Sequence, residues 1–509
     1  MECALLRAPQ ATESSPDVST PSPAASGTNP RRSATLPTLL VFVATLAALW
    51  GFARAYEIPV PEVHDEFGYL LTADTFASGR ITNPTHPFAP HFETFHIFHE
   101  PTYQAKFPPG QGAFLALGTL LGEPIYGVWL CIALALAATT WMLAATMPSR
   151  WAVLGAALLL FDADIFTSWG ESYWGGGVAM LGGALLFGGA ARLGTRVSAV
   201  DSGLMGLGVL LLANSRPLEG GVATVLAVIA MLSRIGTWSR GVPARTLVGR
   251  WLVPLGIGAT LAVGWTLYYN HVVGGDAFRM VYKNWRPVLL HHPNVRNYHG
   301  SANLGMLGEI KRMASFFLSG PLVLALPFLV VRLRAGRSLG ALAIVSMLGA
   351  LSLVASRAWP HYVAPIACLI ALLVVEALRG LAGLRLRGQP VGALAAAALI
   401  VAHLGLGVYE LGNQIRWGPG VRWKHHRQRI LEELEATGSK HLVFVRPAPD
   451  ANYHQDWVFN RADIDGAAVV WAREIEPASD ARLLRHFADR QVWLLHVPAD
   501  EPKLVPYPR

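Results

Sequence analysis

Long apolar segments recur along this chain and limit its possible folds more than any other feature. Several of them approach or exceed the 20 or so residues that an α-helix needs to cross a hydrocarbon layer about 30 Å thick. Only 15% of the residues are charged, against about 25% in an ordinary soluble domain. The sequence therefore predicts a polytopic α-helical membrane protein with about eleven transmembrane helices. The predicted spans lie near residues 37–55, 125–147, 151–166, 175–191, 202–214, 217–232, 251–269, 314–331, 338–355, 361–378 and 390–411.

The basic residues predict how these spans are oriented. Alternate loops carry arginine and almost no acidic residues, as in ARLGTR, RLRAGR and RGLAGLRLRG. Because basic loops stay on the cytoplasmic side, we expect a cytoplasmic N-terminus. The net charge of +8 is spread over these short loops, which argues against a nucleic-acid partner. Residues 1–35 are rich in Ser, Pro, Ala and Thr and are expected to form a disordered cytoplasmic tail.

The rest of the chain divides into a membrane module, residues 36–411, and a C-terminal segment, residues 412–509. The module has two long outer loops, residues 56–124 and 270–313. In the C-terminal segment, RWKHHRQRILEELEATG and DARLLRHFAD predict helices, while HLVFV, AAVVWA and QVWLLHV predict strands. We expect a small α/β domain outside the cytoplasm. Cys3, Cys131 and Cys368 cannot build a disulfide framework.

The stretch EVHDEFGYLL at the start of the first outer loop brings Asp65 and Glu66 to the membrane boundary. Low dielectric disfavours an ionised carboxylate and raises its pKa, which suits a general base. The alternative is an ordinary solvated loop start, where acidic residues are common. The residues that follow decide between the two.

After this acidic pair the loop runs through HFETFHIFHEP and then YQAKFPPGQG. This order resembles the GT-C superfamily of membrane glycosyltransferases, in its bacterial branch of protein mannosyltransferases and aminoarabinose transferases. In that family an acidic residue or pair opens the first outer loop, and a Lys/His-Pro-Pro element closes it. The counterparts here are Asp65, Glu66 and the Lys106-Phe107-Pro108-Pro109 element, in which Phe107 separates the lysine from the prolines.

The resemblance implies an enzyme that transfers a sugar from a polyprenyl-phosphate donor to a lipid, glycan or protein acceptor. The transfer reaction would take place at the periplasmic face of a bacterial inner membrane. A phosphate is a good leaving group, so such a site needs a carboxylate to activate the acceptor hydroxyl and fixed positive charge to hold the phosphate. Asp65 is the first candidate for the base and Glu66 the second, and a single displacement implies inversion at the anomeric carbon.

Four residues are candidates for binding the donor phosphate. Lys106 belongs to the KFPP element, Arg216 lies in NSRPLEG between two short spans, and Arg357 and His361 lie in SRAWPHYVAP. An ionisable residue at membrane depth is a functional hypothesis by default. Arginine at the end of a span is also common without a function, because its side chain extends to the interface.

FDADIFTSWGESYWGGG supplies candidates for binding acceptor or sugar. Glu171 matches a second acidic residue of the resembling enzymes, and Tyr173 and Trp174 suit stacking on a sugar ring. Aromatic residues also gather at membrane interfaces without binding anything.

Histidines crowd the first outer loop, and HFETFHIFHE gives His91, His96 and His99 as weak candidates for metal ligands. Neutral imidazole binds zinc and similar divalent ions, but the spacing matches no recognised ligand set. A divalent metal therefore remains one alternative, and a cofactor-free site is the other.

Two other classes of protein remain open. Charged residues in short or broken spans are also typical of transporters, although those usually show paired halves and no second DE or KFPP segment occurs here. A non-catalytic scaffold, with an outer domain that binds a partner, is the other alternative.

Overall fold

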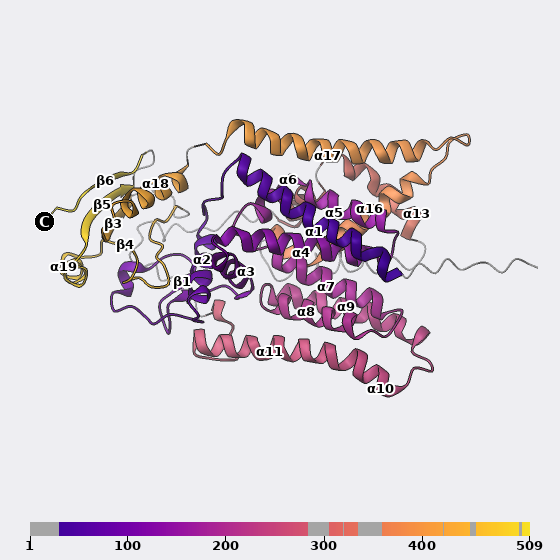
Figure 1. Cartoon of the computed structure of the whole chain (residues 1–509), viewed down its shortest axis with the longest axis horizontal. Coiled ribbons are helices and arrows are strands. Elements are labelled where there is room, and N and C mark those ends of the chain that lie inside the picture. The colour runs from indigo at the N-terminus through magenta and orange to yellow at the C-terminus, as the bar shows by residue number, and fades with distance from the viewer. Residues whose placement is uncertain are drawn as a thin grey trace, which may run out of the picture.

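The computed structural model describes residues 30–283, 305–318, 320–333, 359–420, 422–447, 455–497 and 501–508. Most of the described chain is helical, with a small sheet near the C-terminus (Figure 1). The longer helices are α1 (Pro30–Ala55), α2 (His64–Ala77), α3 (Gly110–Leu120), α4 (Pro124–Leu143), α5 (Ser149–Leu160), α7 (Gly177–Leu193), α8 (Ala199–Ala213), α9 (Pro217–Trp238), α11 (Val253–Gly274), α12 (Gly305–Phe317), α16 (Ala367–Ala382), α17 (Val391–Trp417), α18 (Trp423–Glu435) and α19 (Pro477–His486).

Six of the described helices are long and apolar enough to cross a membrane. Two further pairs pass the same test together but bend, by 63° after Ser149–Leu160 and by 104° after Leu307–Phe317. With the shorter apolar helices α7 and α8, these account for ten of the eleven predicted runs. The remaining run, 338–355, lies outside the described residues, so the count of eleven stays a prediction. The six long spans are Ala34–Ala55, Pro124–Leu143, Pro217–Arg234, Ala244–Gly274, Pro360–Ala382 and Val391–Trp417.

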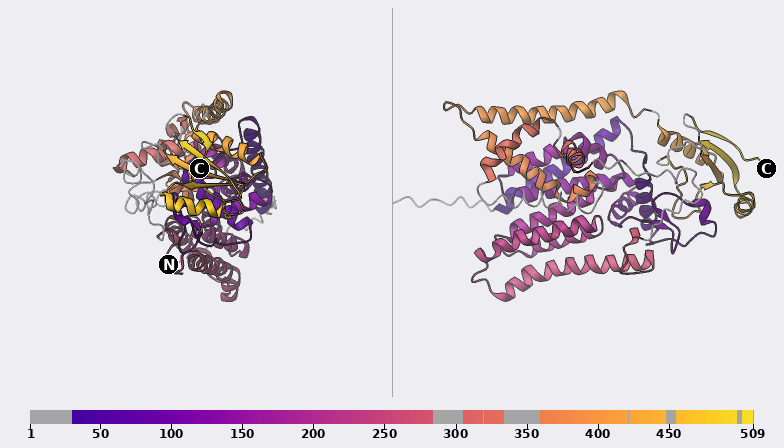
Figure 2. Two further views of the ribbon diagram at one scale, coloured as in Figure 1. Left: turned by 90° about the vertical axis from the view of Figure 1, so that its left-hand side faces the viewer. Right: turned by 180° about the vertical axis from the view of Figure 1, so that it is seen from behind.

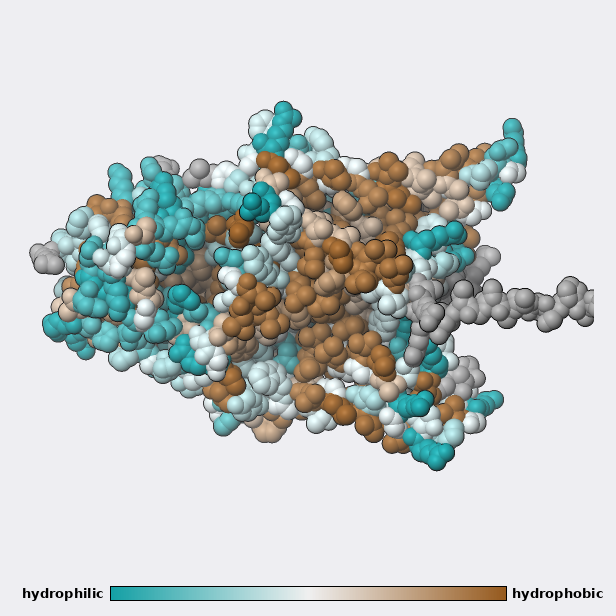
Figure 3. Space-filling view, in the orientation of Figure 1, coloured by the Kyte–Doolittle hydropathy of each residue, from teal (hydrophilic) through white to brown (hydrophobic). Residues whose placement is uncertain are grey.

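Surface hydropathy agrees with a membrane location. Hydrophobic residues cover the middle of the helical bundle, and hydrophilic residues gather at its two ends (Figure 3). Exposed leucine, valine and isoleucine side chains occur on α1, α9, α11 and α17. In water such a surface would be unfavourable, whereas lipid chains cover it without cost.

Helix α7 lies at the centre of the bundle and owes its position to glycine. Its sequence GVAMLGGALLFGGAARL is buried from Gly177 to Ala190. A Cβ atom at Gly183 would lie 1.8 Å from the carbonyl oxygen of Pro365, and one at Gly188 would lie 2.2 Å from the Trp141 ring. Small residues let helices approach closely in membranes, so these glycines set the distance between α7 and its neighbours.

The first outer loop folds into short elements at one end of the bundle (Figure 1). After α2 come the 3₁₀ helix η1 (Ala89–Phe92) and the antiparallel strands β1 (Ile97–Phe98) and β2 (Gln104–Ala105), and then α3. Thr72 on α2 donates a hydrogen bond to Gln104 on β2, 3.1 Å away. The loop is therefore an ordered unit that rests on the bundle.

The C-terminal segment is an α/β domain at the same end of the molecule (Figures 1 and 2). Its sheet has the order β4-β3-β5-β6, parallel except for β6. Residues of α18 pack on one face, and residues of α19 and of the first outer loop pack on the other. The three predicted strands and two predicted helices are all present. The strands are β3 (His441–Pro447), β4 (Val469–Arg473), β5 (Gln491–Val497) and β6 (Lys503–Pro506).

Two details of this region differ from the sequence predictions. Strand β6 was not predicted, and α17 continues to Trp417, beyond the expected domain boundary at residue 412. Figure 1 shows α17 running along one side of the bundle and leading into the domain. The first residues of the expected domain therefore belong to a membrane helix.

Candidate active site

Helix α2 orients the acidic pair of the first outer loop. Glu66 is the third residue of the helix, and its Oε2 accepts hydrogen bonds from the backbone N–H groups of Glu62 and Val63, at 2.7 and 3.0 Å. Its Oε1 accepts one from the N–H of Tyr173, at 3.0 Å. Burial raises the pKa of Glu66, although these hydrogen bonds oppose the shift. With both oxygens engaged by the backbone, Glu66 caps α2 and attaches it to the 171–176 segment.

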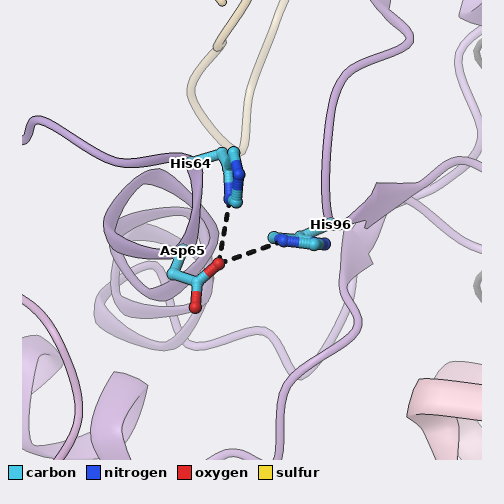
Figure 4. Close-up of side chains that lie close together, drawn as sticks. All are labelled: His64, Asp65 and His96. Atoms are coloured by element: carbon cyan, nitrogen blue, oxygen red, sulfur yellow. Dashed lines mark hydrogen bonds and ion pairs between the residues drawn. The ribbon is translucent and has the colours of Figure 1, made fainter. Parts of the chain in front are cut away.

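Asp65 points to the other side, toward two histidines (Figure 4). Its Oδ1 lies 2.9 Å from His64 Nδ1 and 3.1 Å from His96 Nε2, and its Oδ2 accepts a hydrogen bond from Trp174 Nε1 at 3.2 Å. Burial alone would raise the pKa of Asp65, but the hydrogen bonds and charges of the two imidazoles outweigh it and hold the pKa well below its usual value. The expectation of a raised pKa therefore holds for Glu66 and was wrong for Asp65, where these donors stabilise the ionised carboxylate.

The hairpin of β1 and β2 brings His96 and Lys106 to this carboxylate. The N–H of Lys106 donates to the carbonyl oxygen of His96 at 2.9 Å, just outside the paired strands. His96 adopts φ +64°, a conformation that costs a non-glycine residue energy and is often found at functional sites. Burial lowers the pKa of His96 to about 4 and that of Lys106 to about 8, and the Asp65 charge partly offsets both shifts.

Phe107, which interrupts the KFPP element, has a packing role. Its ring stacks on Tyr69 with centroids 4.6 Å apart, and a Cβ atom at Gly68 would lie 2.9 Å from it. Lys106 Nζ lies 5.4 Å from the centre of the same ring. The inserted phenylalanine thus fixes the end of the loop against α2 and keeps Lys106 beside Asp65.

A cationic side chain completes the site from the bundle. Arg216, which directly precedes α9, lies 4.9 Å from the Tyr362 ring and forms no ion pair among the described residues. A Cβ atom at Gly175 would lie 3.7 Å from Arg216 Nη2 and 3.2 Å from the Tyr69 hydroxyl oxygen, so both groups lie beside this glycine. His361 packs on Trp174 with ring centroids 4.9 Å apart. The Asp65 carboxylate and the Arg216 guanidinium therefore lie near the same residues, since both charges act on Tyr69 and His361.

Of the predicted site residues, the structure brings together Asp65, Lys106, Arg216, His361 and Trp174. Glu171 lies apart from them beside the Trp129 indole, and burial raises its pKa to about 9. Tyr173 contributes its backbone N–H to Glu66. Arg357 lies outside the described residues.

The predicted metal trio is not a cluster. His91 contacts the Arg473 carbonyl oxygen and the Ser479 hydroxyl, and His99 contacts the Phe92 carbonyl oxygen, so both have structural partners. Only His96 belongs to a potential ligand set, with His64 and Asp65 instead. His64, Tyr69 and Tyr362 were missed as site residues, although His64 directly precedes Asp65 and Tyr362 directly follows His361.

The atoms His64 Nδ1, Asp65 Oδ1 and His96 Nε2 lie within 4.8 Å of one another. Two imidazoles and one carboxylate, with further positions open, form a donor set that zinc and similar ions use. The low pKa of His96 keeps this ring neutral at pH 7, as a metal ligand must be. These residues fit a divalent ion, although the positive charge of Lys106 nearby opposes it.

A second group, His86, Asp465 and His486, fits a metal less well. Nδ1 of His86 accepts the N–H of Phe88 at 3.0 Å, so in the neutral ring Nε2 carries the proton that faces Asp465. A metal-binding histidine normally donates through its other nitrogen. We interpret this group as a hydrogen-bonded contact between the loop and the C-terminal domain.

The bundle, the ordered first loop and the terminal α/β domain together define a multi-span helical membrane protein whose fold is similar to that of ArnT. Among solved structures, the chain is similar to ArnT from Cupriavidus metallidurans in the apo state, with a TM-score of 0.54 and 13% identity, over 90% of this chain and 93% of that one. It is similar to the same protein bound to undecaprenyl phosphate, with a TM-score of 0.54, 14% identity and the same coverage. No protein-family model and no curated protein matches the sequence.

Proposed function

We propose that this protein is a membrane glycosyltransferase that moves a sugar from a polyprenyl-phosphate donor to an acceptor hydroxyl. One observation carries the proposal: Asp65, held ionised, and Arg216, without an ion pair in the described part of the chain, border the same Tyr69–Trp174 surface. The fold supports it, since one of the similar ArnT structures is bound to undecaprenyl phosphate.

The carboxylate would act on the acceptor. The hydroxyl oxygen attacks the anomeric carbon while the bond to the phosphate oxygen breaks, which inverts the configuration. Because its pKa is low, Asp65 is a weak base in the free protein, so it would first orient the hydroxyl through a hydrogen bond. The hydroxyl becomes strongly acidic as its oxygen bonds to carbon, and only then would its proton pass to Asp65. Glu66 would hold α2 in place.

The cations would act on the donor. The departing phosphate carries negative charge, and Arg216 and Lys106 would stabilise it as it develops. Arginine can bind phosphate through two parallel hydrogen bonds, whereas Lys106 supplies a point charge close to Asp65. His361 would add a hydrogen bond, and Trp174 would contact the sugar beside Asp65. Arg357 remains a candidate of the same kind.

The proposed reaction could also involve a divalent metal ion bound beside Asp65. His64, Asp65 and His96 would hold it, and it would supply Lewis-acid stabilisation of negative charge when bound. Without it, the same two histidines orient the Asp65 carboxylate and keep it ionised.

We also propose the location of the reaction. The arginine-bearing loops favour a cytoplasmic N-terminus, and by the parity of the spans the first loop and the α/β domain would lie on the outer face. In a bacterial inner membrane that face is periplasmic, and the acceptor would be a glycan, lipid or protein there.

The test uses purified full-length protein in lipid nanodiscs. Wild-type protein should bind undecaprenyl phosphate and transfer sugar from polyprenyl-phosphate sugars, and Arg216→Gln should weaken binding of undecaprenyl phosphate at least tenfold. Arg54→Gln, which changes an exposed arginine at the end of α1, is the matched control and should bind normally. Equal binding by both variants would contradict the role of Arg216 in holding the donor phosphate. Solute uptake into liposomes without any sugar transfer would contradict the proposal and favour a transporter.

A further inference from the structure

A cavity separate from the Asp65 site lies between the first outer loop and the C-terminal domain. Its volume is about 410 Å³, within the range of about 300–1,000 Å³ that small-molecule sites occupy. One wall is α2, another is α18, and the turn between α3 and α4 and the 459–471 segment complete it. Nothing in the proposed reaction uses this space.

Helix α2 separates the cavity from the Asp65 site. Phe67, Leu70 and Asp74 line the cavity, and their spacing of three and four residues places them on one face of the helix. Asp65, Tyr69 and Thr72 have the same spacing and occupy the opposite face. A molecule in the cavity would therefore not be the group that reacts at Asp65.

The floor of the cavity is apolar and firmly packed. The rings of Phe67 and Phe459 stack with centroids 4.0 Å apart and planes within 3°. The Arg427 guanidinium lies 4.9 Å from both Phe67 and Trp471, and donates to the carbonyl oxygens of Trp457 and Phe459. These contacts leave a preformed surface that the C–H groups of a ligand could cover.

The rim is polar and rich in hydrogen-bond acceptors. Glu123 and Glu435 are exposed there and form no ion pair within the described residues, and Gln428 lies beside them on α18. The remaining charges are already matched: Arg461 is paired with Asp74 at 2.8 Å, and Arg427 is bound to carbonyl oxygens. Two unmatched carboxylates disfavour a phosphate or another anion.

A peptide strand is also disfavoured. Strand β4 is the edge of the sheet, where an added strand would pair. The side-chain amide of Asn460 occupies that position, since its Nδ2 donates to the carbonyl oxygen of Trp471 and its Oδ1 accepts the Trp471 N–H, at 2.8 and 2.9 Å. The N–H and carbonyl groups of Trp471, which an added peptide strand would need, are therefore already hydrogen-bonded to Asn460.

From these features we propose that the cavity binds an uncharged saccharide unit. The hydroxyl groups of the sugar donate to the Glu123 and Glu435 carboxylates and to Gln428, and its C–H face covers Leu70 and Leu431. This is a binding site only, and it does not depend on the transfer reaction.

Saturation-transfer NMR on full-length protein in nanodiscs tests the site, with maltotriose, cellotriose and mannotriose as probes. At least one should bind saturably. Leu431→Trp, which fills the cavity, should weaken binding at least tenfold, and Glu435→Gln about threefold. Glu433→Gln, an exposed change on the same helix outside the cavity, should have no effect.

Undecaprenyl phosphate serves as the competitor in the same experiment. The bound saccharide should stay in place, because the two ligands would occupy opposite faces of α2. Absence of binding by all three probes, displacement by undecaprenyl phosphate, or equal binding by wild type and Glu435→Gln would each overturn the proposal. Loss of transfer with retained saccharide binding would count against the proposed enzyme alone.

Discussion

At the residue scale, Lys106 is the site cation whose charge changes in an accessible pH range. Burial lowers its pKa to about 8 from an ordinary value of 10.5, so the side chain is charged below pH 8 and neutral above it. If Lys106 holds the donor phosphate, KM for the donor should rise severalfold between pH 7 and 9, with a smaller change in kcat.

The control for this pH dependence is Lys106→Arg, whose guanidinium stays protonated throughout. Its KM for the donor should remain flat over the same range, whatever its absolute activity. The assignment of Lys106 to the donor would be contradicted by identical KM profiles for the variant and the wild type.

At the scale of elements, a buried ion pair within the C-terminal domain forms hydrogen bonds with the first outer loop. Arg473 on β4 pairs with Asp456, and both side chains are almost fully buried. Thr94 of the loop donates to the same carboxylate at 2.7 Å, and Arg473 Nε donates to the Glu93 carbonyl oxygen at 2.8 Å. The contact therefore links the domain to the loop that carries His96 and Lys106.

We expect Arg473→Met to destabilise the protein by about 3–5 kcal/mol, because it leaves Asp456 buried without its cation. Thermal unfolding, followed with limited proteolysis of the C-terminal domain, measures the effect. The comparison is Arg446→Met, which removes an exposed ion pair with Glu474 and should cost about 0–1 kcal/mol. Equal shifts in the two variants would mean that the buried pair does not hold the domain.

The elements themselves could be predicted from the sequence, because apolar runs and alternating strands are local patterns. Strand β6 was missed because KLVP is short and ends in proline, which is typical of an edge strand. The contacts between elements could not be predicted. Asp65 meets Trp174 across 109 residues, and Phe67 stacks on Phe459. Such pairs depend on tertiary packing. The lowered pKa of Asp65 could not be predicted either, because it depends on the contact with His96 that packing creates.

At the scale of the whole molecule, the first loop and the α/β domain share one end of the bundle (Figure 2). The loop between α9 and α10 (Ala244–Leu247) lies at the opposite end. The predicted orientation places the first end outside the cytoplasm. The sequence could predict that the two parts share one end, because arginine in alternate loops indicates which loops lie on the same side of the membrane. Which side of the membrane that end faces stays a prediction.

Cysteine labelling tests the orientation. In a cysteine-free background, Asp489→Cys in the C-terminal domain should react with a membrane-impermeant maleimide in intact spheroplasts. Arg240→Cys, in the loop after α9, should react only after lysis. Both native positions are exposed. The reverse labelling pattern would place Asp65 on the cytoplasmic side and contradict the proposed topology.

The central claim is that Asp65 acts on the acceptor while the cations hold the donor. The most direct measurement is single-turnover transfer from a polyprenyl-phosphate sugar by Asp65→Asn, which preserves size and removes the charge. We predict that transfer falls at least a thousandfold while undecaprenyl phosphate binds within threefold of wild type. Transfer at the wild-type rate by Asp65→Asn would contradict the account.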